Sequence, residues 1–311
     1  MNRKLISVMT PCFNEEGNVE ELHRRIAAVF ETLPQYEWEH ILIDNASRDS
    51  TPAILRRMAA ADPRVKVILN TRNFGHIRSP FHALLQARGD AVVSLASDLQ
   101  DPPELIAEFI QKWEQGYKVV WGQKITSAES PIFFAVRTAY YKLVRKLADI
   151  ELIEHVTGFG LYDREVVEQL RKINDPYPYG RGLISELGYD VARIPYHQPV
   201  RKSGITSNNF YTLYDMAMLG ITNHSKVPLR IATLLGFAMA LLSLLVAVGY
   251  LLYKIFFWNR FPVGQAPVVI GLFLFSSVQL FFTGVLGEYI AAIHTQVLHR
   301  PLVIEKERIN F

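Results

Sequence analysis

The chain has 311 residues, and its 33 Lys and Arg against 30 Asp and Glu give a formal net charge of only +3 at pH 7. This balance argues against a nucleic-acid-binding protein, which needs a strong basic field. Apolar residues make up 50% of the chain, which excludes a disordered protein, and the single cysteine excludes an intrachain disulfide and a zinc site of the C₄ or C₂H₂ type.

Short apolar runs alternate with helical patterns through the first part of the chain. Strands are predicted at 5–9, 40–43, 65–69, 91–95 and 117–121. Helices are predicted over 19–30, from about 51, over 79–87 and from about 102, where two prolines suit a first turn. Repeated strand–helix units of this length predict an α/β fold with a mostly parallel sheet and helices on both faces.

Two long stretches further along the chain, residues 231–253 and 261–287, carry no charged side chain. Each is long enough to cross the ~30 Å hydrocarbon core of a membrane, so we expect a hairpin of two spans at about 231–253 and 264–287. Two buried core helices are the alternative, although uncharged runs of this length are rare in soluble cores. Cations on both flanks of the hairpin favour a cytoplasmic position for them, even though the short connecting loop carries cations too.

These patterns divide the chain into four parts. We expect a cytoplasmic domain over 1–200, a membrane-interface segment over 201–228, two transmembrane helices within 229–293 and a cytoplasmic C-terminal tail over 294–311. Residues 208–219 group apolar side chains on one helical face, which suits a helix lying on a membrane or an ordinary amphipathic core helix. No apolar h-region follows Met1–Arg3, so no signal peptide is expected.

Polar clusters follow four of the predicted strands, at 10–16, 44–49, 71–76 and 97–101. Ligands of such sheets bind beyond the carboxyl ends of the strands, so these loops are expected to converge on one site. Their carboxylates suit a divalent cation, and Arg72 suits phosphate. Asp44 and Asp98 could also be turn or helix-cap residues. No GxGxxG or P-loop sequence occurs, so a Rossmann dinucleotide site or a Walker ATPase is not supported.

The segments 11–16, 44–51, 71–76 and 98–104 resemble family 2 glycosyltransferases with the GT-A fold. More narrowly, the chain is similar to the polyprenyl-phosphate glycosyltransferases, which include enzymes like dolichol-phosphate mannose synthase, GtrB and ArnC. The likeness extends over nearly the whole chain, including the two apolar stretches and the residues after them.

The resemblance implies transfer of a sugar, with inversion, from a nucleotide-sugar donor to a polyprenyl phosphate at the cytoplasmic membrane, in a chain that could form a homo-oligomer. It implies a nucleotide pocket formed by Pro11, Asn14, Glu15, Asp44 and Ser47. It further implies that Asp98 and Gln100 hold Mg²⁺ or Mn²⁺, that Asp98, Asp101 and Arg72 are catalytic, and that Arg201 and Lys202 bind the acceptor phosphate. Interfacial anchoring to anionic lipid is the other interpretation of Arg201 and Lys202.

Two departures from the family pattern touch this site. Ala96 stands where the family usually has Asp, and Gly158-Phe159-Gly160 stands where it usually has Asp-Phe-Arg. Asp101 or water could complete the metal site, and the two glycines could form a tight turn. A membrane-anchored nucleotide-sugar-binding partner with impaired catalysis is therefore the alternative function.

Overall fold

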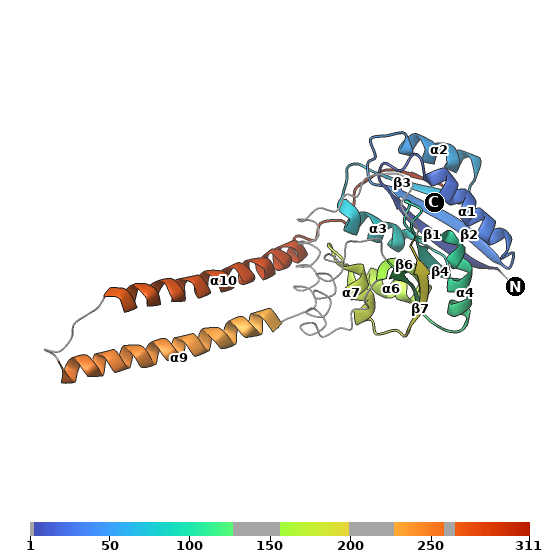
Figure 1. Ribbon diagram of the computed structural model, residues 1–311. Coiled ribbons are helices and arrows are strands. Elements are labelled where there is room, and N and C mark those ends of the chain that lie inside the picture. Colours follow the sequence, from blue (N-terminus) through green and yellow to red (C-terminus); the bar gives the residue numbers. More distant parts are fainter. Residues whose placement is uncertain (1–2, 127–155, 199–226, 258–264) are drawn as a thin grey trace.

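The computed structural model describes residues 3–126, 156–198, 227–257 and 265–311 of the chain. Figure 1 shows an α/β domain from which two long helices project side by side. The N-terminal strand and the last residues of the chain both lie in the domain, at the opposite end from the far ends of the two helices.

A sheet of eight strands, counted over these ranges, forms the centre of the domain. The strands are β1 (Lys4–Cys12), β2 (Tyr36–Asp44), β3 (Val65–Asn70), β4 (Ala91–Ser94), β5 (Val119–Thr126), β6 (Val156–Asp163), β7 (Val191–His197) and β8 (Glu305–Ile309). Their order across the sheet is β7-β5-β6-β4-β1-β2-β3-β8. β1 pairs in parallel with β2 and β4, β2 with β3, and β5 with β7, whereas β6 is antiparallel to β4 and β5. The mostly parallel α/β sheet predicted from the sequence is therefore confirmed.

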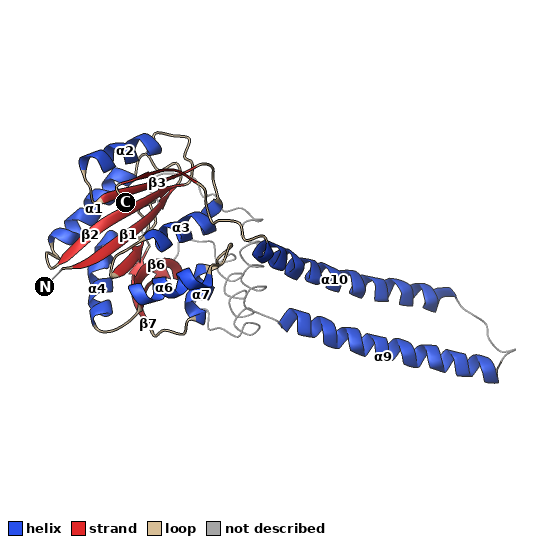
Figure 2. Ribbon diagram, turned by 180° about the vertical axis from the view of Figure 1, so that it is seen from behind, coloured by secondary structure: helices blue, strands red, loops and turns tan. Residues whose placement is uncertain are grey.

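Helices cover both faces of this sheet, as Figure 2 shows from behind. The helices of the domain are α1 (Val19–Glu31), α2 (Thr51–Ala61), α3 (Gly75–Gln86), the 3₁₀ turn η1 (Pro103–Leu105), α4 (Ile106–Glu114), α6 (Arg164–Ile173) and α7 (Gly180–Glu186). Apolar side chains of α1, α2 and α4 pack on one face, and those of α3, α6 and α7 pack on the other.

The α1 helix illustrates how spacing in the sequence sets this packing. Leu22, Ile26 and Val29 recur on one helical face and are buried against the sheet. Complete burial of such an aliphatic side chain contributes about 1.5–3 kcal/mol. Glu20 and Glu21 lie in the first turn, where carboxylates are favoured by the helix dipole.

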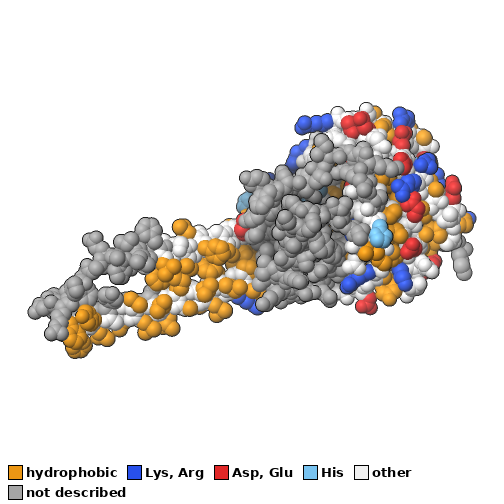
Figure 3. Space-filling view, in the orientation of Figure 1, with side chains coloured by type: hydrophobic (Ala, Val, Ile, Leu, Met, Phe, Trp, Pro, Cys, Tyr) orange, Lys and Arg blue, Asp and Glu red, His pale blue; other side chains and the backbone are white. Residues whose placement is uncertain are grey.

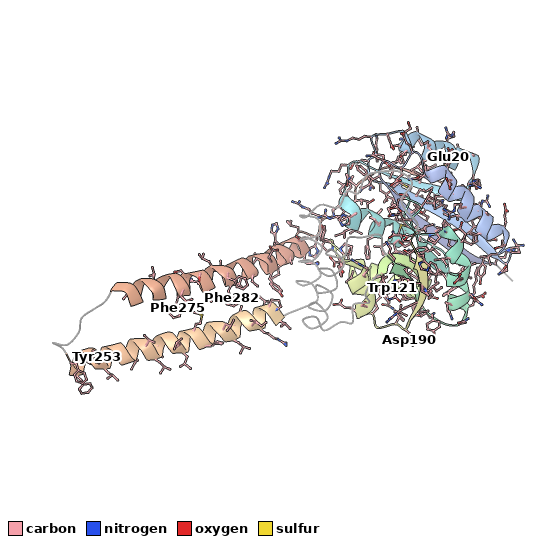
Figure 4. All side chains as sticks on the ribbon, viewed as in Figure 1. Glu20, Trp121, Asp190, Tyr253, Phe275 and Phe282 are labelled. Atoms are coloured by element: carbon pink, nitrogen blue, oxygen red, sulfur yellow. The ribbon has the colours of Figure 1, made fainter. Side chains whose placement is uncertain are left out.

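Helices α9 (Val227–Phe256) and α10 (Gln265–Val297) form the projecting pair. Each contains a stretch long and apolar enough to cross a membrane, Val227–Val246 with mean hydropathy 2.2 and Leu274–Val297 with 1.3. Figure 3 shows hydrophobic side chains along the described parts of both helices, and mixed charges on the domain. Tyr253 lies toward the far end of α9, and Phe275 and Phe282 lie along α10 (Figure 4).

The predicted spans lie mainly inside these helices, but α10 continues to Val297, beyond the predicted end at 287. Its 33 residues make a helix of about 50 Å, longer than a ~30 Å hydrocarbon core. The additional turns bring Gln296 to the domain, where its Nε2 donates a hydrogen bond of 2.9 Å to Oδ1 of Asp175.

The residues expected as a tail contain the edge strand β8, which pairs antiparallel with β3. Ile309 lies opposite Val67, and Glu305 lies opposite Asn70. The proposed boundaries of the four parts of the chain stay predictions, and most of the interface segment 201–228 lies outside the described residues.

Candidate active site

Four polar loops follow the carboxyl ends of β1, β2, β3 and β4, which are neighbours in the sheet. From β1 the chain moves through β2 to β3 on one side and then continues with β4 on the other side of β1. In open α/β sheets, the crevice at such a reversal of strand order is where ligands bind. The topology therefore gathers the predicted residues Asn14, Asp44, Arg72 and Asp98 along one edge.

Hydrogen bonds join the first two loops directly. The backbone N–H of Asn14 donates to Oγ of Ser47 at 2.8 Å, and Oδ1 of Asn14 accepts from the N–H of Arg48 at 2.9 Å. Asn14 has φ 56° and Ala46 has φ 62°, a left-handed conformation that is uncommon outside glycine. Backbone strain of this kind is maintained by the surrounding contacts and is often found at functional sites.

Asp44 ends β2 and is 1% exposed. Its Oδ2 accepts from the N–H of Ser47 at 3.1 Å, whereas its Oδ1 is buried with no hydrogen-bond partner among the described residues. Burial raises the pKa of this carboxyl, and hydrogen bonds from residue 47 partly offset that effect. A buried unpaired acceptor costs about 1–3 kcal/mol, so an N–H or O–H donor of a ligand would be favoured at Oδ1.

The other two predicted nucleotide-pocket residues are bound within the protein. Glu15 is buried and accepts from Nδ2 of Asn18 at 2.6 Å, while its backbone N–H donates to Oγ1 of Thr51 at 2.9 Å. Pro11 lies inside β1, opposite Ile43 of β2. These contacts give Glu15 a role in fixing the first loop to α2, and a direct contact of Glu15 with nucleotide stays a prediction.

Asn45 connects the second and third loops, a role that the sequence patterns did not single out. Its Nδ2 donates to Oδ1 of Asn73 at 2.9 Å and to the carbonyl of Gly75 at 3.1 Å. Its Oδ1 accepts from the N–H of Phe74 at 2.9 Å. An asparagine directly after a predicted strand, followed by polar residues, is the signal that could have pointed to this hub.

Arg72 lies on the third loop and is exposed. Its guanidinium carbon lies 4.0 Å from the ring centroid of Phe74, and Nη1 donates to the carbonyl of Asn73 at 3.0 Å. In this conformation its described contacts are with its own loop, so the catalytic role expected for Arg72 stays a prediction.

The fourth loop presents Asp98 and Gln100, both half-buried, on either side of Leu99, which has φ 60°. The N–H of Gln100 donates to Oδ1 of Asp98 at 3.2 Å. Ala96 is half-buried in the same loop. Over the described ranges, no group of three or more His, Cys, Asp or Glu side chains could hold a metal ion, so metal binding by Asp98 and Gln100 stays a prediction.

Asp101 is turned inward and is 6% exposed. Its Oδ1 accepts from the hydroxyl of Tyr196 on β7 at 2.6 Å, and burial raises the pKa of the carboxyl. This geometry favours a positioning role for Asp101 over contact with substrate. Tyr196 was not identified from the sequence, although the alternation of buried and exposed residues in β7 points its side chain into the core.

The segment Gly158-Phe159-Gly160 belongs to β6 and forms part of the core. The tight turn considered from the sequence is therefore not formed, because the segment is paired in the sheet, although Gly158 does adopt φ 93°. Phe159 packs against Phe109 with 4.9 Å between the ring centroids. The predicted acceptor residues Arg201 and Lys202 lie outside the described residues. A cavity of about 600 Å³ beside Leu5 and Trp38 opens at the other edge of the sheet, away from the loops.

The family described as Glycosyl transferase family 2 matches residues 7–171, more than half of the chain. The chain belongs to this family. It is a glycosyltransferase, as the sequence resemblance predicted.

Several relatives match this glycosyltransferase over nearly its full length. It is 34% identical over 303 residues to the bactoprenol glucosyl transferase of Shigella phage SfV, covering 97% of this chain and 98% of the relative. It is 34% identical over 300 residues to the uncharacterized glycosyltransferase YkcC of Bacillus subtilis, covering 96% and 92%. The prophage bactoprenol glucosyl transferase homolog of Escherichia coli K12 is 32% identical over 302 residues, with coverage of 97% and 98%.

A solved structure shares the fold. The glucosyl-3-phosphoglycerate synthase of Mycobacterium tuberculosis, crystallised with Mn²⁺, UDP and phosphoglyceric acid, has a TM-score of 0.50 and 21% identity. The likeness covers 70% of this chain and 76% of that one.

Proposed function

We propose that this glycosyltransferase transfers a sugar from a nucleoside-diphosphate sugar to a polyprenyl phosphate at the cytoplasmic membrane. The observation that carries the proposal is the alignment with bactoprenol glucosyl transferases over 97–98% of both chains, a length that includes α9 and α10. A polyprenyl acceptor lies in lipid with its phosphate at the surface, and two apolar helices would hold the domain at that surface.

The donor nucleoside is proposed to occupy the edge formed by the first two loops, next to Pro11, Asn14, Asp44 and Ser47. The unpaired Oδ1 of Asp44 supports this placement because it can accept from an N–H or O–H of a nucleoside. Glu15 would act on this pocket through the loop that it fixes.

The diphosphate is proposed to bind at the fourth loop with a divalent cation. Carboxylate and amide oxygens are ligands that Mg²⁺ and Mn²⁺ accept, and Mg²⁺ is commonly bound by one or two protein oxygens plus substrate phosphates. Asp98 and Gln100 fit that requirement, and Ala96 leaves further positions to phosphate and water. A cation at this loop would neutralise charge that develops on the leaving diphosphate.

The acceptor phosphate is the proposed nucleophile. One of its oxygens attacks the anomeric carbon, the bond from that carbon to the diphosphate oxygen breaks, and the nucleoside diphosphate leaves with the electron pair. Attack from the face opposite the leaving group inverts the anomeric centre. The phosphate is ionised at neutral pH, so this reaction does not require a general base of high pKa. Arg72, Arg201 and Lys202 are the proposed cationic contacts of the phosphate groups.

The proposal is tested with the full-length protein in detergent, undecaprenyl phosphate and a panel of nucleotide sugars, followed by detection of a new glycolipid. We expect product with at least one donor, and a rate loss of roughly 10²-fold or more in the Asp98→Ala variant or in EDTA. Nucleotide binding without product under any pairing would instead support the partner protein without turnover. Full activity in EDTA would remove the cation from the proposal.

A further inference from the structure

The residues that follow the membrane hairpin lie beside the third loop. The backbone N–H of Thr71 donates to the carbonyl of Ile304 at 3.0 Å, and its Oγ1 donates to the same oxygen at 3.1 Å. Thr71 directly precedes Arg72 on the loop 71–75. Two donors on one carbonyl therefore fix the beginning of that loop against the residue that precedes β8.

An ion pair and a side-chain hydrogen bond hold β8 to helices on both faces of the sheet. Nη2 of Arg56 on α2 lies 2.7 Å from Oε2 of Glu307. Nε2 of His82 on α3 lies 2.6 Å from Oε1 of Glu305. The exposed Arg56–Glu307 pair contributes little by itself, but together with the His82–Glu305 contact and the β3–β8 ladder it defines one register for the strand.

The other end of this connection is attached as well. Gln296 near the end of α10 donates to Asp175 at 2.9 Å, and Val303 is 6% exposed in the domain. Between them, His299 adopts φ 45°, which turns the chain after α10. The path from the membrane helix to β8 is thus short and bound to the domain at both ends.

We propose that Ile304 and β8 position the loop 71–75 for the donor and tie that loop to the membrane hairpin. The inference rests on the proposed function, because it takes this loop to be part of the donor site. Ile304 and the strand act through Thr71 and are positioning elements, with no contact to substrate.

The test compares Thr71→Val with Thr32→Val in the full-length protein. Thr32 is a matched control because its Oγ1 also donates to a backbone carbonyl, that of Val29, at 2.7 Å, at the end of α1.

Binding of UDP and GDP is measured by calorimetry, and exchange of the amide hydrogens in loop 71–75 is measured without nucleotide. We expect Thr71→Val to weaken nucleotide binding about 3- to 10-fold and to accelerate loop exchange, with the Michaelis constant for lipid acceptor unchanged within about twofold. Thr32→Val should leave all three unchanged.

A second variant removes residues 305–311. We expect it to insert into membranes, to lose roughly 10-fold or more in nucleotide affinity, and to recover on addition of the synthetic peptide 305–311. Equal nucleotide affinity and loop exchange in Thr71→Val and Thr32→Val would overturn the inference, whether or not the shortened chain folds. A wild-type protein that binds neither nucleotide would show that the donor carries a different base, while the exchange comparison would still test the positioning.

Discussion

The hydroxyl of Tyr196 and the carboxylate of Asp101 meet at 2.6 Å in a part of the domain where both side chains are buried. Tyr196→Phe removes this donor and leaves Oδ1 of Asp101 without it. Because hydrogen bonds to charged or buried groups are worth about 1.5–3 kcal/mol, we expect a loss of that size in the free energy of unfolding. We also expect weaker Mn²⁺ binding at the neighbouring Asp98, measured by electron paramagnetic resonance with UDP present.

The control for this substitution is Tyr189→Phe. Its hydroxyl donates to Glu165 at 3.0 Å on the surface, where a lost hydrogen bond costs much less. If the two variants unfold at the same denaturant concentration and bind Mn²⁺ equally, the bond to Asp101 does not support the fourth loop.

Asp44 leads to a prediction about pH. Burial raises the pKa of Asp44 in the folded protein, so this carboxyl takes up a proton at a higher pH than an ordinary Asp, near 3.9. Between the ordinary pKa of an Asp and the raised pKa of Asp44 in the folded protein, the folded state binds more protons than the unfolded state. The contribution of Asp44 to stability therefore falls as the pH rises through that window. Nucleotide binding should change in the opposite direction, because the proton competes for the oxygen offered to the ligand.

The measurement is UDP affinity against pH for the wild type and for Asp44→Asn. We expect wild-type affinity to weaken as the pH falls toward the raised pKa, and the variant to bind weakly with a flatter profile. The same pH profile in both proteins would show that a different group governs nucleotide binding.

At the scale of single elements, strand β6 depends on the small size of Gly160. A Cβ built on Gly160 would lie 2.3 Å from the carbonyl oxygen of Val120 and 2.8 Å from the Trp121 ring. Since a backbone carbonyl in the sheet cannot move aside cheaply, Gly160→Ala should destabilise the domain by about 3 kcal/mol or more. Gly116→Ala is the comparison: it has φ 101° and no atom within 4 Å of the added Cβ, so only torsional strain of about 1–2 kcal/mol is expected.

The two glycine variants are compared by their denaturation midpoints in one detergent. A midpoint for Gly160→Ala equal to or above that of Gly116→Ala would mean that β5 and β6 can separate locally. The close approach also gives a physical reason for glycine at this position, where an arginine side chain could not be accommodated in the described packing.

The elements that the sequence predicted well are those with strong local patterns. Strands β1 to β5 and helices α1 to α4 carry compact apolar runs or helical spacing, and the polar residues after the strand ends predict the loops. β8 has the sequence Glu-Lys-Glu-Arg-Ile, in which charged residues dominate. Its place beside β3 comes from pairing with residues more than two hundred positions earlier, which local periodicity cannot reveal. The inward position of Asp101 likewise depends on a distant partner, Tyr196.

At the scale of the whole molecule, the hairpin begins and ends on the same side as the domain. α9 and α10 run side by side away from it, and β8 returns to the sheet that contains β1 (Figure 1). A two-span hairpin places both of its flanks on one side of a membrane, so the domain and the C-terminal strand must share a compartment. By the positive-inside rule, the cations on both flanks of the hairpin predict that this compartment is the cytoplasm.

This topology can be tested by cysteine labelling, because the native Cys12 is only 2% exposed and should react little in the folded protein. Phe257→Cys places a thiol at the far end of α9, and Lys306→Cys places one on β8. In intact cells, we expect an impermeant maleimide to label Phe257→Cys, and to label Lys306→Cys only after the membrane is permeabilised.

The reverse pattern would place the domain outside the cytoplasm. Labelling of both thiols before permeabilisation would show that α9 and α10 do not cross the membrane as a hairpin. Because the length of each helix exceeds the ~30 Å core, exposure of Phe257→Cys on the far side is what the geometry of α9 requires.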